Sequence, residues 1–172
     1  MIINNFWLKP FFWVGIYLIG YTITILVVTS SKISMKIENS IPKALVRIFV
    51  FLTFVLPIII LPFTEGPKIA IPTIIAVMVG IFFLGLNFYL KIIAHRDIGI
   101  SPALKSKTNL ITTGIYGIIR NPLYLSNTLL AIGMAVLFKS GYALLFSLVY
   151  FLFFWPIIYF EERDFEKIWR RI

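Results

Sequence analysis

The residues whose types could do chemistry gather in one polar stretch, residues 110–124, with the sequence LITTGIYGIIRNPLY. Gly114 and Gly117 allow the backbone to turn and to approach a ligand closely. Arg120 carries a permanent charge and a planar fork of donors, and Pro122 stands at the start of an apolar run, where helices tolerate proline. Such a stretch suits the binding of a polar group at a bilayer surface. A basic loop that only sets membrane topology is the alternative on composition alone.

The composition is that of an integral membrane protein. Of 172 residues, 60% are hydrophobic and 13% are charged, whereas soluble domains carry about 25% charged residues. The chain has no cysteine and one histidine, His95, so we expect neither disulfides nor a metal site. The net charge of +9 is spread among apolar runs. We ascribe it to membrane topology and anionic lipid headgroups, not to nucleic acid.

Five apolar runs approach the roughly 20 residues that a helix needs to cross a bilayer. We predict an all-α, polytopic membrane helix bundle that forms a single domain. Its spans are expected at residues 11–30, 44–62, 70–94, 122–138 and 141–160. Pro57 should kink the second span, and Ala76 and Gly80 should give the third a close-packing face. Asn87 at membrane depth indicates either a functional site or, as we favour, an interhelical hydrogen bond.

A long polar loop is expected at residues 95–121, and a loop of that length in a compact bundle is usually functional or disordered. Residues 139–141 leave room only for a tight hairpin between the fourth and fifth spans. The start of the fourth span and the end of the fifth should therefore lie at one depth. This would bring Arg120 close to Glu161 and Glu162, which follow the fifth span. An acidic pair that merely begins a solvated helical turn is the alternative.

The distribution of lysine and arginine predicts the orientation. Of the 16 lysines and arginines, twelve fall on one side of the five predicted spans, with Arg47 near that side, and only Lys9, Lys68 and Lys139 fall on the other. By the positive-inside rule, the N-terminus is expected outside and the C-terminus in the cytosol. The long loop and the two glutamates would then share the cytosolic face.

The order and spacing of these residues resemble a known signature, Gly-x-Tyr-x-x-x-Arg-His-Pro-x-Tyr followed by Glu-Glu. That signature belongs to the isoprenylcysteine carboxyl methyltransferase and phospholipid methyltransferase superfamily. The matching residues here are Gly114, Tyr116, Arg120, Asn121, Pro122 and Tyr124, then Glu161 and Glu162. Asn121 replaces the usual histidine. An asparagine side chain can still form hydrogen bonds, but it does not titrate. The likeness extends from about residue 96 to residue 169, with the cofactor motif at residues 95–124 and 161–169.

The resemblance implies a methyltransferase that uses S-adenosylmethionine in a cytosolic pocket and acts on a lipid-like or prenylated acceptor among the membrane lipids. Arg120 would brace the site as its catalytic residue. The residues that would line the cofactor pocket are Thr108, Asn109, Leu110, Ile111, Tyr116, Asn121, Pro122, Leu123, Tyr124, Glu161 and Glu162. Carboxylates suit ribose hydroxyls or cationic groups, and backbone N–H groups at a helix start suit a carboxylate. The alternatives are an NADPH-dependent, sterol-reductase-like protein and a non-catalytic small membrane protein.

Overall fold

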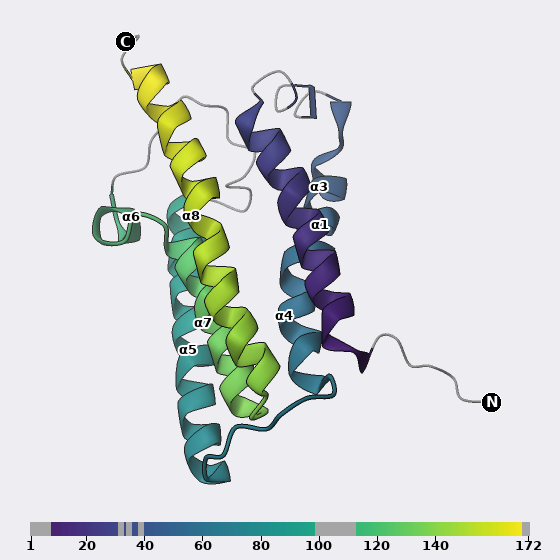
Figure 1. Ribbon diagram of the computed structural model, residues 1–172. Coiled ribbons are helices and arrows are strands. Elements are labelled where there is room, and N and C mark those ends of the chain that lie inside the picture. The colour runs from purple at the N-terminus through teal and green to yellow at the C-terminus, as the bar shows by residue number, and fades with distance from the viewer. Residues whose placement is uncertain (1–7, 31–32, 34–35, 38–39, 99–112, 170–172) are drawn as a thin grey trace, which may run out of the picture.

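The computed structural model describes residues 8–30, 33, 36–37, 40–98 and 113–169, with only the backbone given for residues 98 and 161–169. The described chain is a bundle of helices that run up and down along a common direction (Figure 1). This confirms the predicted all-α membrane bundle. In chain order the helices are α1 (Pro10–Thr29), α3 (Lys43–Val50), the π-helix η2 (Phe51–Val55), α4 (Leu56–Ile60), the 3-10 helix η3 (Leu61–Phe63), α5 (Thr73–Ile98), α6 (Ile115–Ile118), α7 (Pro122–Leu137) and α8 (Gly141–Trp169).

Four helical segments in the described ranges are long and apolar enough to cross a membrane. They are Pro10–Thr29, Lys43–Phe63, Thr73–Asp97 and Gly141–Phe160. The fifth apolar helix, α7, has 16 residues and is about 24 Å long at 1.5 Å per residue. It is therefore shorter than a bilayer core of about 30 Å. The chain is an integral membrane protein, and its described part contains four long helices with this shorter one packed among them.

The second span contains the distortion expected at Pro57. The N–H of Leu56 bonds to the carbonyl of Phe51, five residues back, in the π pattern of η2. A proline ring clashes with the carbonyl four residues before it, here that of Thr53, and a widened turn relieves this contact. Thr53 also meets α1 closely, because a Cβ on Gly20 would lie 2.3 Å from the Thr53 Cβ.

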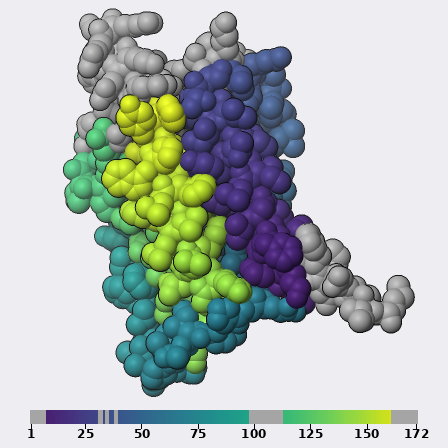
Figure 2. Space-filling view, in the orientation of Figure 1, coloured from purple at the N-terminus to yellow at the C-terminus, as the bar shows by residue number. Residues whose placement is uncertain are grey.

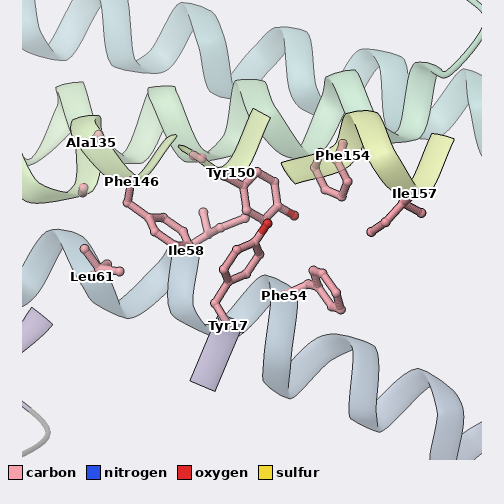
Figure 3. Close-up of a cluster of buried hydrophobic side chains, with 11 residues drawn as sticks. Tyr17, Phe54, Ile58, Leu61, Ala135, Phe146, Tyr150, Phe154 and Ile157 are labelled. Carbon is pink, nitrogen blue, oxygen red and sulfur yellow. The ribbon is translucent and has the colours of Figure 1, made fainter. Parts of the chain in front are cut away.

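An aromatic core joins α1 and the second span to α8. Tyr17 and Tyr150 are fully buried, with ring centroids 5.3 Å apart, and the hydroxyl of Tyr17 points toward Tyr150 (Figure 3). Phe54 and Phe146 meet Tyr17 edge-on at 5.5 and 5.0 Å. Lipid tails are as apolar as these rings, so close packing is what favours the contact over lipid. α1 and α8 accordingly lie side by side along one face (Figure 2).

The contact between α5 and α7 depends on small residues. Ala76 is fully buried, a Cβ on Gly80 would lie 2.7 Å from the Cβ of Leu137, and a Cβ on Gly133 would lie 3.1 Å from Leu84. The predicted close-packing face at Ala76 and Gly80 is therefore confirmed. The two antiparallel helices are in a defined register, with Gly80 opposite Leu137 and Leu84 opposite Gly133.

The interhelical hydrogen bond that we favoured for Asn87 is not formed by its carbonyl oxygen. Asn87 is 2% exposed, and its Oδ1 has no hydrogen-bond partner within the described chain. The α5–α7 register gives the reason. Asn87, three residues after Leu84, comes opposite Leu130, three residues before Gly133, and a leucine side chain cannot donate a hydrogen bond.

The hairpin between α7 and α8 is as tight as predicted. Lys139 has φ 55, and the N–H of Ser140 bonds to the carbonyl of Ala135 at 2.8 Å. The connection before α5 packs on this turn, since the N–H of Gly141 bonds to the carbonyl of Pro67 at 2.8 Å. These bonds fix the end of the bundle opposite to α6 (Figure 1).

Candidate functional site

Helix α5 continues four residues past its predicted end and carries His95, Arg96 and Asp97 in its last turns. The prediction that the polar loop begins at residue 95 is therefore wrong for residues 95–98. Two effects favour the longer helix. Basic side chains in a last turn interact favourably with the helix dipole, and the carboxylate of Asp97 bonds to the next described segment.

That bond joins α5 to α6. The Oδ2 of Asp97 accepts a hydrogen bond from the backbone N–H of Ile115 at 2.9 Å, and the Nε of Arg96 lies 3.4 Å from Oδ1. The N-cap of α6 is Gly114, with φ 62 and ψ −138. A Cβ at Gly114 would lie 2.1 Å from the Oδ2 of Asp97. Position 114 therefore needs glycine, both for its backbone conformation and for its close approach to the carboxylate of Asp97. The hydrogen bond from Ile115 to Asp97 holds the start of α6 against the end of α5.

Tyr116, in α6, has a buried hydroxyl with no hydrogen-bond partner within the described chain. Burial, and then the negative charge of Asp97, raise the pKa of Tyr116 to about 12. The hydroxyl is therefore neutral over the physiological pH range and can both donate and accept a hydrogen bond. A buried hydroxyl without a partner costs free energy, and a polar group of a bound ligand would remove that cost.

The start of α7 has the form of an anion site. Asn121 is its N-cap and makes no capping hydrogen bond with its side chain. Pro122 is the first helical residue and is buried, and the N–H of Leu125 bonds to the carbonyl of Asn121 at 3.1 Å. Helical geometry directs the N–H groups before Leu125 out of the helix end, where they can meet an anionic group.

Arg120 lies in the short connection between α6 and α7, and its side chain is exposed. The connection between α6 and α7 lies at the end of the bundle where α5 ends (Figure 1). The predicted contact of Arg120 with Glu161 or Glu162 stays a prediction, because the side chains of both glutamates lie outside what the structure describes.

The ring of Tyr124 points into the bundle. It packs on Phe154 of α8 with the ring centroids 4.6 Å apart, so Tyr124 contributes to the packing of α7 on α8. Of the other predicted pocket residues, Leu123 is half-buried in the first turn of α7. The positions that lie outside the described residues are Thr108, Asn109, Leu110 and Ile111.

The predicted depth of the fifth span needs a correction. Pro122 and Phe160 were expected at one level, but Tyr124 lies beside Phe154. Phe160 is six residues after Phe154, and Pro122 is only two before Tyr124. Phe160 is therefore four residues, or about 6 Å, farther along the bundle than Pro122. The backbone at the two glutamates leaves the bundle about one helical turn beyond the start of α7.

Sequence reasoning assigned no role to Asp97, although a signal was available. A carboxylate in the last turn of a helix is disfavoured by the helix dipole, so an aspartate there needs a partner. The partner is the backbone N–H of Ile115, which directly follows Gly114 at the start of the polar motif.

Neither the depression found on the surface of α1 nor a group of metal-binding side chains is part of this site as the structure describes it. A shallow depression lined by Leu18, Ile19, Thr22 and Ile23 lies on α1 alone, and its one polar side chain, Thr22, donates to the carbonyl of Leu18. Among the residues that the structure describes, no three histidine, aspartate or glutamate side chains are grouped as a metal site would require.

The fold and this junction define a class: small polytopic membrane proteins with a polar, glycine-containing motif where three helices meet at one membrane face. The phospholipid methyltransferase family matches residues 75–171, more than half of the 172 residues. The chain belongs to this family. The match begins in the first turn of α5, well before residue 96, and it includes the whole of the junction. No curated protein and no solved structure matches the chain.

Proposed function

We propose that the protein transfers a methyl group from S-adenosylmethionine to a lipid acceptor at the membrane surface. The observation that carries this proposal is the buried hydroxyl of Tyr116, which has no hydrogen-bond partner within the described chain. Tyr116 lies within the residues that the family match covers. The bound cofactor supplies an electrophilic methyl group on a sulfonium. Methyl transfer to a nucleophile depends mainly on positioning and on the exclusion of water.

The residues of the junction suit the parts of this cofactor. The N–H groups at the start of α7 would bind the methionine carboxylate, and the neutral hydroxyl of Tyr116 would bond to a polar group nearby. Glu161 and Glu162 would accept from the ribose hydroxyls or the amino group, and Arg120 would brace the carboxylates. The other pocket residues proposed are Thr108, Asn109, Leu110, Ile111, Asn121, Pro122, Leu123 and Tyr124.

The acceptor would reach this site from the bilayer. The helices around the junction are apolar on their outer faces, and a lipid acceptor is already concentrated in the membrane. Membership in the phospholipid methyltransferase family favours a phospholipid over a prenylated acceptor. The N-terminus is proposed to lie outside and the cofactor site in the cytosol, where anionic lipids attract the basic segments.

Cofactor binding tests the proposal and separates it from its alternatives. Purified protein in detergent would be titrated with S-adenosylmethionine, its demethylated product and NADPH, and the shift in melting temperature recorded. A ligand that binds the native state raises this temperature by mass action. We expect S-adenosylmethionine and its demethylated product to raise the melting temperature of the parent, and to raise that of Tyr116→Phe by less. The matched control is Tyr89→Phe, which changes an exposed tyrosine of α5. A rise in melting temperature with NADPH alone would favour a reductase. If no ligand raised the melting temperature, a non-catalytic protein would be favoured.

A further inference from the structure

Lys91 is a charged residue inside a membrane-spanning helix. It lies in α5, seven residues before the end of that helix at Ile98, and its side chain is half-buried. Charged residues within membrane spans are costly, face the bundle interior or a polar cavity, and mark functional sites. The function proposed above assigns no role to Lys91.

The position of Lys91 on α5 places it toward α7. Gly80, Leu84, Asn87 and Lys91 follow one another at intervals of four, three and four residues, so they share one face of the helix. Gly80 and Leu84 contact α7 directly. Lys91 therefore continues the row that faces α7 and does not belong to the lipid-facing side of α5.

The register fixes the level of Lys91. Seven residues after Leu84, it comes opposite Ser126, which is seven residues before Gly133. Ser126 is fully buried, and its hydroxyl donates to the carbonyl of Leu123 in its own helix at 2.9 Å. This level is one turn, about 6 Å, inside the start of α7. A lysine stem is long enough to span that distance, so the ammonium can reach the level of the start of α7.

Among the side chains that the structure describes, which exclude those of residues 161–169, no acidic group forms an ion pair with Lys91. The ion pairs found there join Lys9 to Glu65 and Arg96 to Asp97. One turn deeper in the same row, the Oδ1 of Asn87 also has no hydrogen-bond partner within the described chain. An ammonium at the edge of the hydrocarbon without an anion is unfavourable, and the anion that a bilayer offers at this depth is the phosphate of a lipid.

We propose that Lys91 binds the phosphate group of the phospholipid acceptor and so determines which lipids the protein accepts. The identity of this lipid as the methyl acceptor rests on the function proposed above. Phosphate bound by Lys91 lies on the α5 side of the junction, and the N–H groups at the start of α7 remain for the cofactor carboxylate. The acyl chains lie along the bundle in the bilayer. Lys91 is a specificity-determining residue in this arrangement and makes no contact with the reacting atoms.

Lipid binding tests the proposal without any catalytic step. Protein in detergent would be mixed with phosphatidylethanolamine or with diacylglycerol of the same chains, and bound lipid counted by native mass spectrometry. We expect the phospholipid to bind at least about tenfold more weakly to Lys91→Met, in keeping with the loss of a hydrogen bond to a charged group. Diacylglycerol should bind equally to both proteins. Lys91→Arg should keep the phospholipid, and Lys43→Met, which removes an exposed lysine on α3, should resemble the parent.

The outcomes that would overturn the proposal are distinct. Equal phospholipid binding by the parent and Lys91→Met would exclude Lys91 as the phosphate site. Displacement of the lipid by inorganic phosphate at the same concentration would show a site for free phosphate, which also contradicts a lipid ligand.

A kinetic measurement links the site to the reaction. In Lys91→Met, KM should rise about tenfold for an aminophospholipid and stay unchanged for a single-chain amine without phosphate, while affinity for S-adenosylmethionine is retained. An equal rise for both acceptors would contradict the proposal. If the parent bound no S-adenosylmethionine, the proposed function would fail, and the lipid-binding measurement would still decide the role of Lys91.

Discussion

The carboxylate of Asp97 and the backbone N–H of Ile115, 18 residues apart in sequence, form a 2.9 Å hydrogen bond between the end of α5 and the start of α6. The side chain of Asp97 is 14% exposed, so water competes little for this bond. Tyr116 follows Ile115 directly. Its buried hydroxyl therefore owes its position to a residue of the preceding membrane helix.

Removing the carboxylate of Asp97 should weaken cofactor binding. In Asp97→Ala the N–H of Ile115 loses its acceptor, and we expect the affinity for S-adenosylmethionine to fall by about tenfold or more. Asp97→Asn keeps an acceptor oxygen and should lose less. Isothermal titration calorimetry measures both, with Glu65→Ala at the opposite end of the bundle as control. Parent-like affinity in Asp97→Ala would show that this bond does not position the cofactor site.

A side chain at Gly114 should destabilise the junction. Its φ of 62 and ψ of −138 belong to a region that costs other residues about 1–3 kcal/mol, and the new Cβ would meet the Oδ2 of Asp97 at 2.1 Å. Gly114→Ala should therefore lower the melting temperature. The control is Gly85→Ala, because nothing lies within 4 Å of a Cβ at Gly85 and alanine favours a helix. Equal melting temperatures for the two variants would contradict the geometry at Gly114.

Tyr116 should ionise only in strong alkali. Its pKa is raised from 10.0 to about 12, so the native state holds this proton more tightly than the unfolded state does. The associated stabilisation is complete below pH 10 and is lost as the pH rises toward 12. The tyrosinate absorbance of the parent minus that of Tyr116→Phe gives this titration. Asp97→Asn should lower the pKa of Tyr116, though not to 10.0, because burial is the larger cause. An unchanged titration in Asp97→Asn would exclude the charge of Asp97 as a cause.

Arg120 should affect cofactor binding more than its exposure alone suggests. If it neutralises one of the two glutamates, Arg120→Ala weakens S-adenosylmethionine binding about tenfold. Because the side chain is exposed and screened by water, we expect weakening and not complete loss. Arg120→Lys should recover little, since an ammonium cannot reproduce the bidentate fork. If Arg120 served topology alone, Arg120→Lys would bind the cofactor as the parent does.

The sequence alone determined the class of fold and the membership of the family. Lipid offers no hydrogen bonds, so an apolar run of membrane length must satisfy its backbone internally as a helix. Hydropathy therefore predicted the four membrane-length helices, whereas the fifth predicted span is the shorter helix α7. The turn expected at residues 139–141 lies between α7 and α8, which begins at Gly141. The motif from Gly114 to Tyr124 is local too, and its spacing was enough to indicate the methyltransferase superfamily that the family match confirms.

Only the tertiary structure decided which residues meet. Asp97 can bond to Ile115 because α5 runs past its predicted end. The last turn of α5 is in turn stabilised by this bond to Ile115, which lies outside the apolar run from which the helix was predicted. Asn87 comes opposite Leu130 because the close contacts at Gly80 and Gly133 set the register of α5 on α7. Hydropathy is a sum over neighbouring residues and carries no information on such a register. The register is determined by side-chain shape at the contact between two helices, which exists only after they have packed.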